Sequence, residues 1–329
     1  ADRMLAFETI AEFESNLGNT NLLEIPNASN RGRVFAKCEW ENPTGSIKDR
    51  VAYHLVMNEL RGRMPGERIK ILEYTGGSLG VSLALITRLL GLECRLILSE
   101  ATSASIINSI RHYGADTVLV DREEGFLGVI NKAIAVYEAD PTWAFLFQHE
   151  NSANLECHYQ TTGIEILNQA PSGIDAWVAS IGTGGSLMGV YQRLREVNPQ
   201  IALYATNPDE LAYGDVCPPN CHKKFSGSGG LGFGNKQRFV RENEHQVKHH
   251  FRIRYEDCLQ RMWTFYQTEG IKLGSSAAAN LIAAEAVAAT QNQHQSTYTI
   301  FPSLATTEEW NDAEILARSS AKHSLAAAL

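Results

Sequence analysis

The chain has 329 residues, enough for one large domain or two ordinary domains with real cores. Its 29 Lys and Arg residues and 37 Asp and Glu residues give a formal net charge of −8, which argues against nucleic acid or an anionic membrane as the main partner. No apolar run reaches the length of a membrane span and the first residues lack a signal-peptide pattern, so we expect a cytoplasmic protein.

Hydrophobic periodicity predicts a short amphipathic helix over residues 3–16 and extended segments over 22–25 and 33–40. From there strands and helices alternate. The further predicted strands are 69–75, 94–99, 117–120, 143–147, 176–181, 201–206, 251–254 and 297–301. The further predicted helices are 79–90, 103–113, 126–138, 152–168, 187–197, 256–268 and 276–290. This rhythm predicts an α/β fold with parallel sheets, which bind ligands at the carboxyl ends of their strands.

The six cysteines are scattered, and only Cys217 and Cys221 lie close together in the sequence. Their spacing does not match a zinc knuckle, and no second pair accompanies them. The adjacent His249 and His250 alternate across a predicted strand and therefore face opposite ways. We expect free thiols in a reducing cytosol and assign no metal.

The stretch at residues 41–50 reads ENPTGSIKDR and leads into a helix. Asn-Pro signals a turn, Ser46 can cap the helix, and Asp49 supplies an acidic side chain in the first turn. The apolar stripe of this helix comprises Ile47, Val51 and Leu55.

Lys48 therefore lies in the first turn of this helix, one step from the buried stripe. The helix N-terminus and partial burial both disfavour an ammonium, so more of the free amine is present near neutral pH. A lysine so placed can form a Schiff base with an aldehyde. A solvated Lys-Asp-Arg helix start is the alternative.

Two strand–loop–helix junctions combine glycines with hydroxyl side chains. The first reads EYTGGSLG at 73–80, and the second reads SIGTGGSL at 180–187. Glycines permit close backbone approach, and a helix start offers unpaired N–H groups. That combination binds anions, especially phosphate.

The second junction also opens like a nicotinamide-dinucleotide fingerprint. We disfavour that reading because the third glycine is displaced to Gly189. No acidic residue clearly ends the strand at 201–206 to hold the ribose, since the candidate Asp209 lies beyond Pro208, and Lys48 has no role in that scheme.

Together these motifs resemble those of the fold type II pyridoxal-phosphate (PLP) enzymes, the tryptophan synthase β superfamily, and within it the cysteine synthase and cystathionine β-synthase branch. The match runs nearly end to end. NPTGSIKDR at 42–50 is close to the Schiff-base motif of that branch, and GTGGS at 182–186 resembles its phosphate-binding loop. The resemblance implies two three-layer αβα domains with twisted, parallel-type sheets, and PLP as the cofactor.

The resemblance also implies roles for single residues. Lys48 maps onto the cofactor lysine, and Ser276, with Ser275 as the fallback, maps onto the serine that faces the pyridine nitrogen. The residues implied to bind the cofactor are Lys48, Ser78, Gly182, Thr183, Gly184, Gly185, Ser186 and Ser276. Those implied to bind the substrate are Thr75, Gly76, Gly77, Leu79, Gln148, Ser228 and Gly229.

Two of these positions depart from the family pattern. Ser78 replaces an Asn that bonds the cofactor's ring hydroxyl, and Leu79 replaces a hydroxyl that helps to hold the substrate carboxylate. We therefore expect the protein to act in a specialised pathway, such as the synthesis of a non-standard amino acid, and not in housekeeping cysteine synthesis. Residues 207–247 lack periodicity and are too long for an idle connection, so we expect a functional loop or lid there.

The activity implied is a PLP-dependent β-replacement on a serine- or cysteine-derived amino acid through an aminoacrylate intermediate, in a homodimer. A β-eliminating lyase or dehydratase that releases a 2-oxo acid and ammonia is the first alternative, and a degenerate homologue that regulates a partner is the second. Lys223, Lys224 and Arg238 could meet an anionic leaving group or form a solvated basic patch.

The resemblance implies a domain division as well. Residues 51–153 form a smaller, mobile, substrate-side domain, and 1–50 plus 154–325 form a larger PLP-binding domain. We interpret residues 326–329 as a vector-derived tail.

Overall fold

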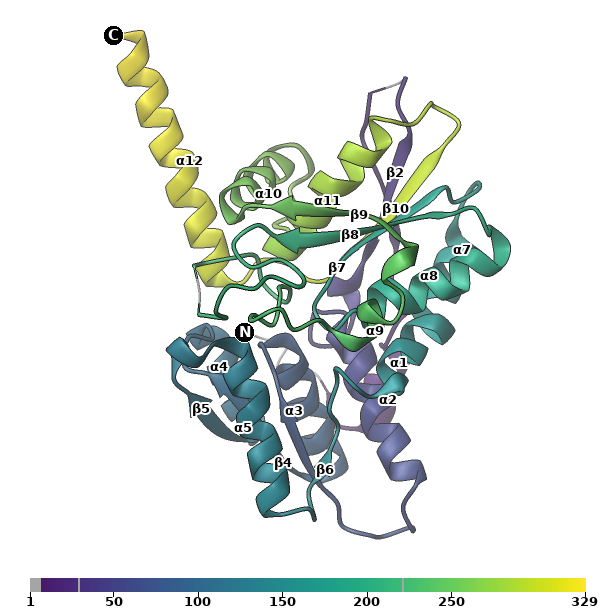
Figure 1. The fold of residues 1–329 in the computed structure, drawn as a ribbon, viewed down its shortest axis with the longest axis vertical. Coiled ribbons are helices and arrows are strands. Elements are labelled where there is room, and N and C mark those ends of the chain that lie inside the picture. Colours follow the sequence, from purple (N-terminus) through teal and green to yellow (C-terminus); the bar gives the residue numbers. More distant parts are fainter. Residues whose placement is uncertain (1–6, 29, 221) are drawn as a thin grey trace.

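The strands form two separate sheets in the computed structural model, which describes residues 7–28, 30–220 and 222–329 (Figure 1). The larger sheet has the strand order β1-β2-β10-β7-β8-β9, and the smaller has the order β5-β4-β3-β6. Within the described residues every neighbouring pair is parallel except β1 against β2. The strands are β1 Leu22–Ile25, β2 Arg33–Cys38, β3 Lys70–Tyr74, β4 Glu93–Ser99, β5 Asp116–Val120, β6 Ala144–Phe145, β7 Ala176–Ser180, β8 Ala202–Pro208, β9 Val247–Ile253 and β10 Ser296–Phe301. The α/β prediction is confirmed.

Helices cover both faces of each sheet. The helices are α1 Ile10–Ser15, α2 Lys48–Arg61, α3 Ser78–Leu90, α4 Ala104–His112, α5 Gly125–Ala139, α6 Ser152–Cys157, α7 Gly163–Gln169, α8 Gly185–Val197, α9 Arg238–Arg241, α10 Tyr255–Glu269, α11 Ser275–Ala288 and α12 Thr307–Ala328. Short 3-10 turns occupy Glu39–Glu41, Arg122–Glu124 and Glu244–Gln246, and a π-helical turn occupies His158–Thr162.

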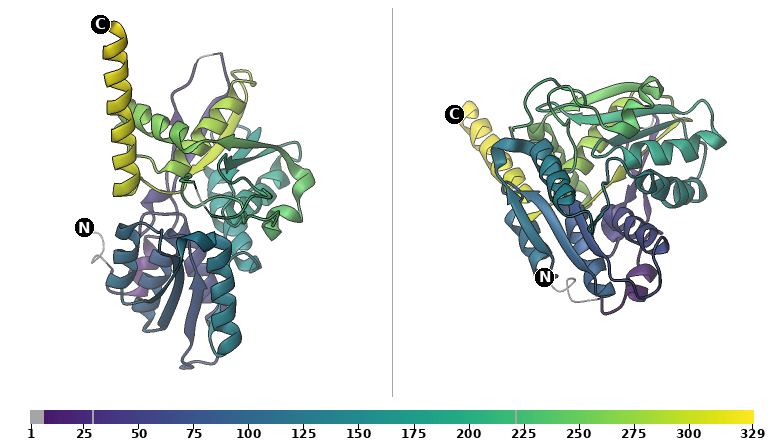
Figure 2. Two further views of the ribbon diagram at one scale, coloured as in Figure 1. Left: turned by 60° about the vertical axis from the view of Figure 1, so that its left-hand side comes forward. Right: turned by 60° about the horizontal axis from the view of Figure 1, so that its bottom comes forward.

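The smaller sheet is buried on both sides because its strands are almost continuously apolar. Ile71 and Leu96 pack with α2, α3 and α4 on one face, whereas Leu72 and Ile97 pack with α5 on the other. In the larger sheet α7 and α8 cover one face and α11 covers the other, together with part of α10. Each sheet is therefore the middle of three layers, and the sheets occupy different parts of the molecule (Figure 2).

The order of strands reverses once in each sheet. In the smaller sheet the chain leaves β3 toward β4 and β5 and returns on the other side of β3 as β6. In the larger sheet it leaves β7 toward β8 and β9 and returns on the other side of β7 as β10. Such switch points open a crevice at the carboxyl ends of the strands, where α/β folds bind ligands. The loops after β3 and after β7 are the two glycine-rich junctions.

Several predicted elements differ from the observed ones. Within the described residues the first helix begins only at Ile10, where Thr9 caps it, and the predicted residues 3–6 lie outside the description. The predicted helix 152–168 is interrupted by the π turn at His158–Thr162, a local distortion common at functional sites. Strand β9 begins at Val247, earlier than residue 251, because it pairs with β8 over that length.

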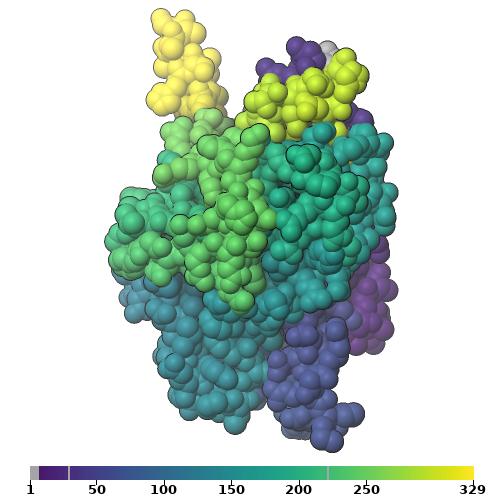
Figure 3. All heavy atoms as spheres, turned by 45° about the vertical axis from the view of Figure 1, so that its right-hand side comes forward, coloured from purple at the N-terminus to yellow at the C-terminus, as the bar shows by residue number. Residues whose placement is uncertain are grey.

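Helix α12 was not predicted, since its C-terminal half has no apolar face to bury. Residues 318–329 are exposed, and the helix projects beyond the body in both the ribbon and space-filling views (Figures 1 and 3). None of the helices in the described chain combines the length and the apolarity that a membrane span requires. The domain boundaries at 51 and 154 stay a prediction, as does the origin of residues 326–329.

Candidate active site

Lys48 is the first residue of α2, where the sequence places it. The predicted stripe is confirmed, because Ile47, Val51 and Leu55 are all buried. Lys48 is itself partly buried, and desolvation lowers the pKa of its amine to about 8. No carboxylate of the described residues forms an ion pair with this amine. A desolvated amine without a counter-ion is a nucleophile near neutral pH.

A buried carboxylate fixes the backbone around Lys48. Asp49 accepts hydrogen bonds from the backbone N–H of Thr44 at 2.7 Å and from the hydroxyls of Thr44 and Ser82, both at 2.6 Å. Burial raises the pKa of Asp49 to about 6. Ser46 accepts from the Lys48 N–H at 3.2 Å, although the capping position itself is Ile47. Because Ser82 lies in α3, Asp49 connects α2 to a helix that packs on the smaller sheet.

Arg50 holds the other side of the same turn. Its guanidinium donates to Glu39 at 2.5 and 3.1 Å and to Glu165, in α7, at 2.6 and 2.9 Å. Lys37 of β2 pairs with Glu165 at 3.0 Å. The charges in this buried network compensate one another, so α2 is anchored to elements of the larger sheet. The two residues after Lys48 therefore fix its backbone from opposite directions.

The junction between β3 and α3 folds around one hydroxyl. Thr75 accepts from the backbone N–H groups of Gly77 at 2.9 Å and Gly80 at 3.0 Å. A Cβ on Gly80 would lie 2.7 Å from the Thr75 side chain, so only glycine fits there. The N–H groups of Ser78 and Leu79, in the first turn of α3, have no hydrogen-bond partner among the described residues. They present two donors to an anion at this edge of the smaller sheet.

The two departures from the family pattern lie in different surroundings. The Leu79 side chain is 3% exposed and packs in the hydrophobic core with α2 and α3, so only its backbone N–H is available to a ligand. The Ser78 side chain is partly buried at the helix start, and Gly76 is exposed. The core position of Leu79 follows from the helix face it shares with Leu83 and Ile86.

Gln148 lies three residues after the end of β6, next to the end of β3. Its side-chain amide donates to the Tyr74 carbonyl oxygen at 2.7 Å. The carboxylate of Glu73 accepts from the backbone N–H groups of Phe147 at 2.7 Å and of Gln148 at 3.0 Å. Burial raises the pKa of Glu73 to about 8. Glu73 therefore positions the Gln148 backbone against the β3 junction.

The junction between β7 and α8 is a cradle of backbone groups. Gly184 precedes the helix with φ of 88°, which favours glycine, and no side chain caps α8. The Thr183 hydroxyl accepts from the Gly185 N–H at 3.1 Å and from the Asn154 amide at 2.8 Å. A Cβ on Gly185 would lie 2.3 Å from Asn154 Oδ1, and one on Gly182 would lie 2.6 Å from a backbone oxygen. Glycine is required at both positions, and a helix N-terminus without a side-chain cap is the kind of site that binds anions.

Part of the predicted lid is hydrogen-bonded onto this cradle. The Ser228 hydroxyl and the Gly229 N–H both donate to the Ile181 carbonyl oxygen, at 2.8 and 3.0 Å. The Gln237 amide donates to the carbonyl oxygens of Gly182 at 3.1 Å and Gly229 at 2.8 Å. Residues 228–237 therefore brace the β7 junction. Their predicted contact with substrate stays a prediction.

The two candidate serines at the start of α11 differ in their contacts. The Ser275 hydroxyl accepts from the Ser226 N–H at 2.9 Å, and the Ser275 N–H donates to Glu309 at 2.7 Å. Among the described residues Ser276, although buried, has no hydrogen-bond partner for its hydroxyl. The Ser276 hydroxyl is the one available to a ligand.

The basic residues of the 207–247 segment are engaged with the protein. Lys223 pairs with Asp312 at 2.5 Å and Arg238 with Glu242 at 2.9 Å, while Lys224 donates to the Ser228 carbonyl oxygen. These contacts favour the solvated-patch alternative over a leaving-group site. No group of three or more His, Cys, Asp or Glu side chains in the described chain is arranged to hold a metal.

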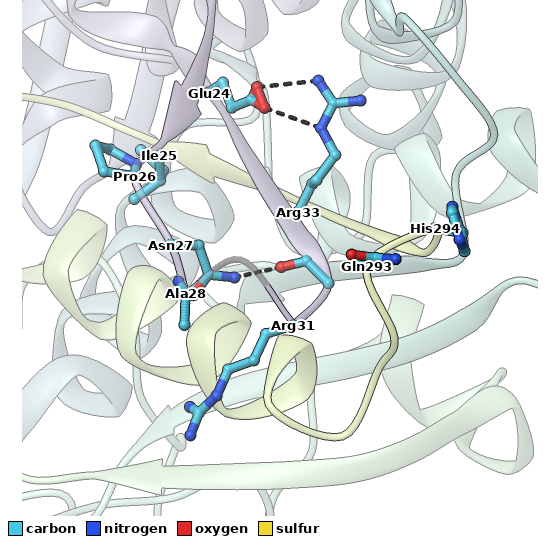
Figure 4. Close-up of a pocket in the computed structure, with 10 residues that line it drawn as sticks. Glu24, Ile25, Pro26, Asn27, Ala28, Arg31, Arg33, Gln293 and His294 are labelled. Atoms are coloured by element: carbon cyan, nitrogen blue, oxygen red, sulfur yellow. Dashed lines mark hydrogen bonds and ion pairs between the residues drawn. The ribbon is translucent and has the colours of Figure 1, made fainter.

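A surface pocket of about 740 Å³ lies elsewhere, at the amino ends of β2 and β10. Figure 4 shows the Glu24–Arg33 ion pair at the top of this view and Gln293 and His294 at the right. Parallel sheets bind ligands at the opposite edge, where Lys48 lies.

Sequence reasoning missed the supports of the site: Tyr74, Glu73, His149 and Asn154. His149 directly follows Gln148, and Tyr74 directly precedes Thr75, so a search for polar residues flanking the predicted loops would have found both.

Comparison with known proteins identifies the family of the chain. The family model described as "Pyridoxal-phosphate dependent enzyme" matches residues 13–303. Cysteine synthase 3 of Caenorhabditis elegans is 33% identical over 82% of this chain and 79% of its own. The crystal structure of an O-acetylserine-dependent cystathionine β-synthase from Helicobacter pylori aligns with a TM-score of 0.80 at 25% identity, over 89% of this chain and 95% of the other. A hydrogen sulfide-producing enzyme of Fusobacterium nucleatum, solved with an α-aminoacrylate intermediate, aligns with a TM-score of 0.78 at 25% identity, over 92% and 90%.

The chain therefore belongs to the pyridoxal-phosphate-dependent enzymes, in the cysteine synthase family. Its cofactor is pyridoxal phosphate.

The residues present fit that cofactor. The glycine-rich start of α8 matches a phosphate, because no side chain caps this helix and its first N–H groups can donate to an anion. Lys48 offers an amine with a lowered pKa to an aldehyde. Asn154 Oδ1 and His149 Nε2 are buried polar atoms without a protein partner in the described residues, as expected where a polar ligand belongs.

Proposed function

We propose that this protein catalyses a cysteine synthase-like β-replacement on a serine- or cysteine-derived amino acid, with a non-standard amino acid among the candidate products. The observation that carries the proposal is Lys48. Lys48 begins α2 with an unpaired, desolvated amine, and the next two residues connect this helix start to α3 and to α7. Membership of the cysteine synthase family supports the reaction class.

The β7–α8 junction would hold the cofactor phosphate. The N–H groups of residues 182–186 and the helix dipole supply the attraction, together with the hydroxyls of Thr183 and Ser186. Lys48 would hold the cofactor's aldehyde carbon. When bound, pyridoxal phosphate supplies an electron sink that lets an amino acid lose its α-proton and a β-substituent.

The β3–α3 junction would hold the substrate carboxylate. The unpartnered N–H groups of Ser78 and Leu79 are aligned donors at a helix N-terminus, and Thr75, Gly76, Gly77 and Gln148 surround them. Because the Leu79 side chain is in the core, this junction would recognise a carboxylate through backbone groups.

Lys48 would also move the proton at the substrate α-carbon. A pKa of about 8 leaves an appreciable fraction of the amine free at neutral pH, which general-base catalysis requires. The Ser276 hydroxyl would face the cofactor's ring nitrogen. A neutral hydroxyl holds a proton there less firmly than a carboxylate, which moderates the electron sink and suits β-elimination followed by addition.

The test is product analysis on the purified protein. We expect O-acetyl-L-serine and sulfide to yield cysteine and acetate, with O-phospho-L-serine, serine and cysteine as the other β-substituted candidates. Pyruvate and ammonia as the sole products would favour a lyase instead. A protein that binds the cofactor but shows no spectral change with any of the four amino acids would favour the non-catalytic homologue.

We infer a homodimer as the assembly and the cytoplasm as the location. Light scattering of the purified holoenzyme tests the first, and fractionation of the source cells tests the second. A C₂ dimer is the commonest symmetric assembly of soluble proteins.

A further inference from the structure

His149 is a buried imidazole at the site that the reaction above does not use. It directly follows Gln148 and is 5% exposed. Its ring stacks on Tyr74 with centroids 5.5 Å apart and lies 5.9 Å from the ring of Phe126. Nδ1 lies 2.6 Å from the Tyr74 hydroxyl, whereas Nε2 has no hydrogen-bond partner among the described residues.

The contacts of Tyr74 determine which nitrogen of His149 carries the proton. The Tyr74 oxygen accepts from the backbone N–H of His149 at 3.2 Å, and its own proton needs an acceptor because the side chain is fully buried. The acceptor in reach within the described chain is His149 Nδ1. With Nδ1 accepting, the neutral ring carries its proton on Nε2. The unpartnered atom is therefore an N–H donor.

This donor lies at the proposed reaction site. His149 follows β6 at the switch point of the smaller sheet, on the chain segment that faces Thr75. Burial and the charge of Lys48 together lower the pKa of His149 to about 3, and the Gly182 backbone, which lies near the ring without meeting hydrogen-bond geometry, opposes both. His149 thus has Lys48 and the phosphate cradle as neighbours and remains neutral at physiological pH.

We propose that His149 is a ligand-binding residue whose Nε2–H donates a hydrogen bond to an acceptor oxygen of the molecule held at Lys48. That oxygen belongs either to the β-substituent of the amino acid or to the cofactor ring. A buried N–H without an acceptor is costly, and a ligand oxygen removes that cost. This inference rests on the proposed function, which supplies the ligand.

The first test reads the tautomer directly. ¹⁵N NMR of the histidine-labelled holoenzyme should show one ring with Nε2 protonated and Nδ1 unprotonated, unchanged between about pH 5 and pH 8. The signal is assigned by its loss in His149→Phe. In Tyr74→Phe, Nδ1 loses its proton donor and the tautomers should mix. A proton on Nδ1 in the wild type, or an ordinary titration in this range, overturns the proposal.

The second test measures the hydrogen bond. His149→Phe keeps a ring of similar size and removes the donor, and we expect kcat/KM for O-acetyl-L-serine to fall about tenfold or more. β-Chloro-L-alanine has no oxygen in its leaving group, so it shows whether the acceptor oxygen belongs to the β-substituent or to the cofactor ring. A loss with O-acetyl-L-serine alone assigns the bond to the β-substituent. Equal losses together with a shifted cofactor absorbance band assign it to the cofactor.

Unchanged kinetics and an unchanged cofactor spectrum in His149→Phe overturn the proposal. His250→Phe is the matched control, because His250 also stacks on a tyrosine, at 5.2 Å, and bonds Asn207 away from the site. If the wild type binds the cofactor but consumes neither amino acid, the proposed function fails on its own. The shift of the His149 Nε2 signal when pyridoxal phosphate is added to the cofactor-free protein then still decides whether the donor meets a ligand.

Discussion

Lys37 and Lys48 are two lysines of the same segment in opposite environments. The Lys37 side chain is 0% exposed, and its ammonium pairs with Glu165 at 3.0 Å and donates to the Thr20 carbonyl oxygen at 2.7 Å and to Gln169 at 3.0 Å. Lys48 lies at a helix N-terminus, and the part of the chain that the structure describes offers its amine no counter-ion. One amine is saturated with partners, whereas the other keeps its reactivity.

The comparison teaches that burial alone does not make a lysine reactive. Burial with a complete set of acceptors produces a structural cation, which anchors α2 through the Glu165–Arg50 network. Burial without acceptors lowers the pKa and frees the amine. The same network thus holds the backbone of the second lysine while giving its side chain nothing to bind.

Replacing the two lysines one at a time should produce the largest difference in catalysis. Lys48→Met should lower kcat/KM about 10⁴-fold, because both the covalent attachment and the general base are lost. Lys37→Met, a substitution of the same kind, should keep most of the activity. Borohydride reduction followed by peptide mass spectrometry measures the covalent link. A cofactor adduct that persists in Lys48→Met would contradict the assignment.

The next effect is on stability. Arg50→Leu leaves Glu39 buried without its positive partner, so the free energy of unfolding should fall by about 3–5 kcal/mol. Urea titration of wild type and variant measures the difference. A loss below about 1 kcal/mol would mean that the network does not anchor α2.

Replacing each lysine by Met in the cofactor-free protein at pH 7 should change the free energy of unfolding in opposite directions. Lys37→Met should lose about 1–3 kcal/mol, because acceptors of the buried ammonium lose a partner. Lys48→Met should gain stability, since it removes a desolvated ammonium without a counter-ion. If urea titration shows that both variants lose stability, or that both gain it, the two lysines do not differ in environment as described.

The smallest effect is a pH dependence. The pKa of Lys48 is about 8 in the folded protein and about 10.4 in an unfolded chain, so the unfolded state binds more protons between these values. Stability of the cofactor-free protein should therefore rise with pH across that window. Thermal unfolding of the wild type and of Lys48→Met at each pH measures this dependence, and the variant should not show the rise in stability. An identical pH profile in the variant would assign the lowered pKa to another group.

The sequence predicted most elements but misjudged those that depend on distant contacts. Helix 187–197 and strand 176–181 came from local periodicity and agree with α8 and β7 to within two residues at each end. The π turn at His158–Thr162 and the early start of β9 were missed, because both depend on neighbours remote in sequence. In the site, the family resemblance implies Ser276 and leaves Ser275 as the fallback. The hydrogen bond that Ser275 accepts from Ser226 favours Ser276 on physical grounds, because it occupies the Ser275 hydroxyl.

By itself the sequence determined the α/β class, the helix that begins at Lys48, and the two glycine-rich junctions, because periodicity and turn chemistry act over a few residues. Tertiary structure alone decided what each polar group meets. Arg50 bonds a carboxylate 115 residues away, and Tyr74 bonds a histidine 75 residues away. The reactivity of Lys48 depends on which charges fold toward it, and no local pattern encodes that set.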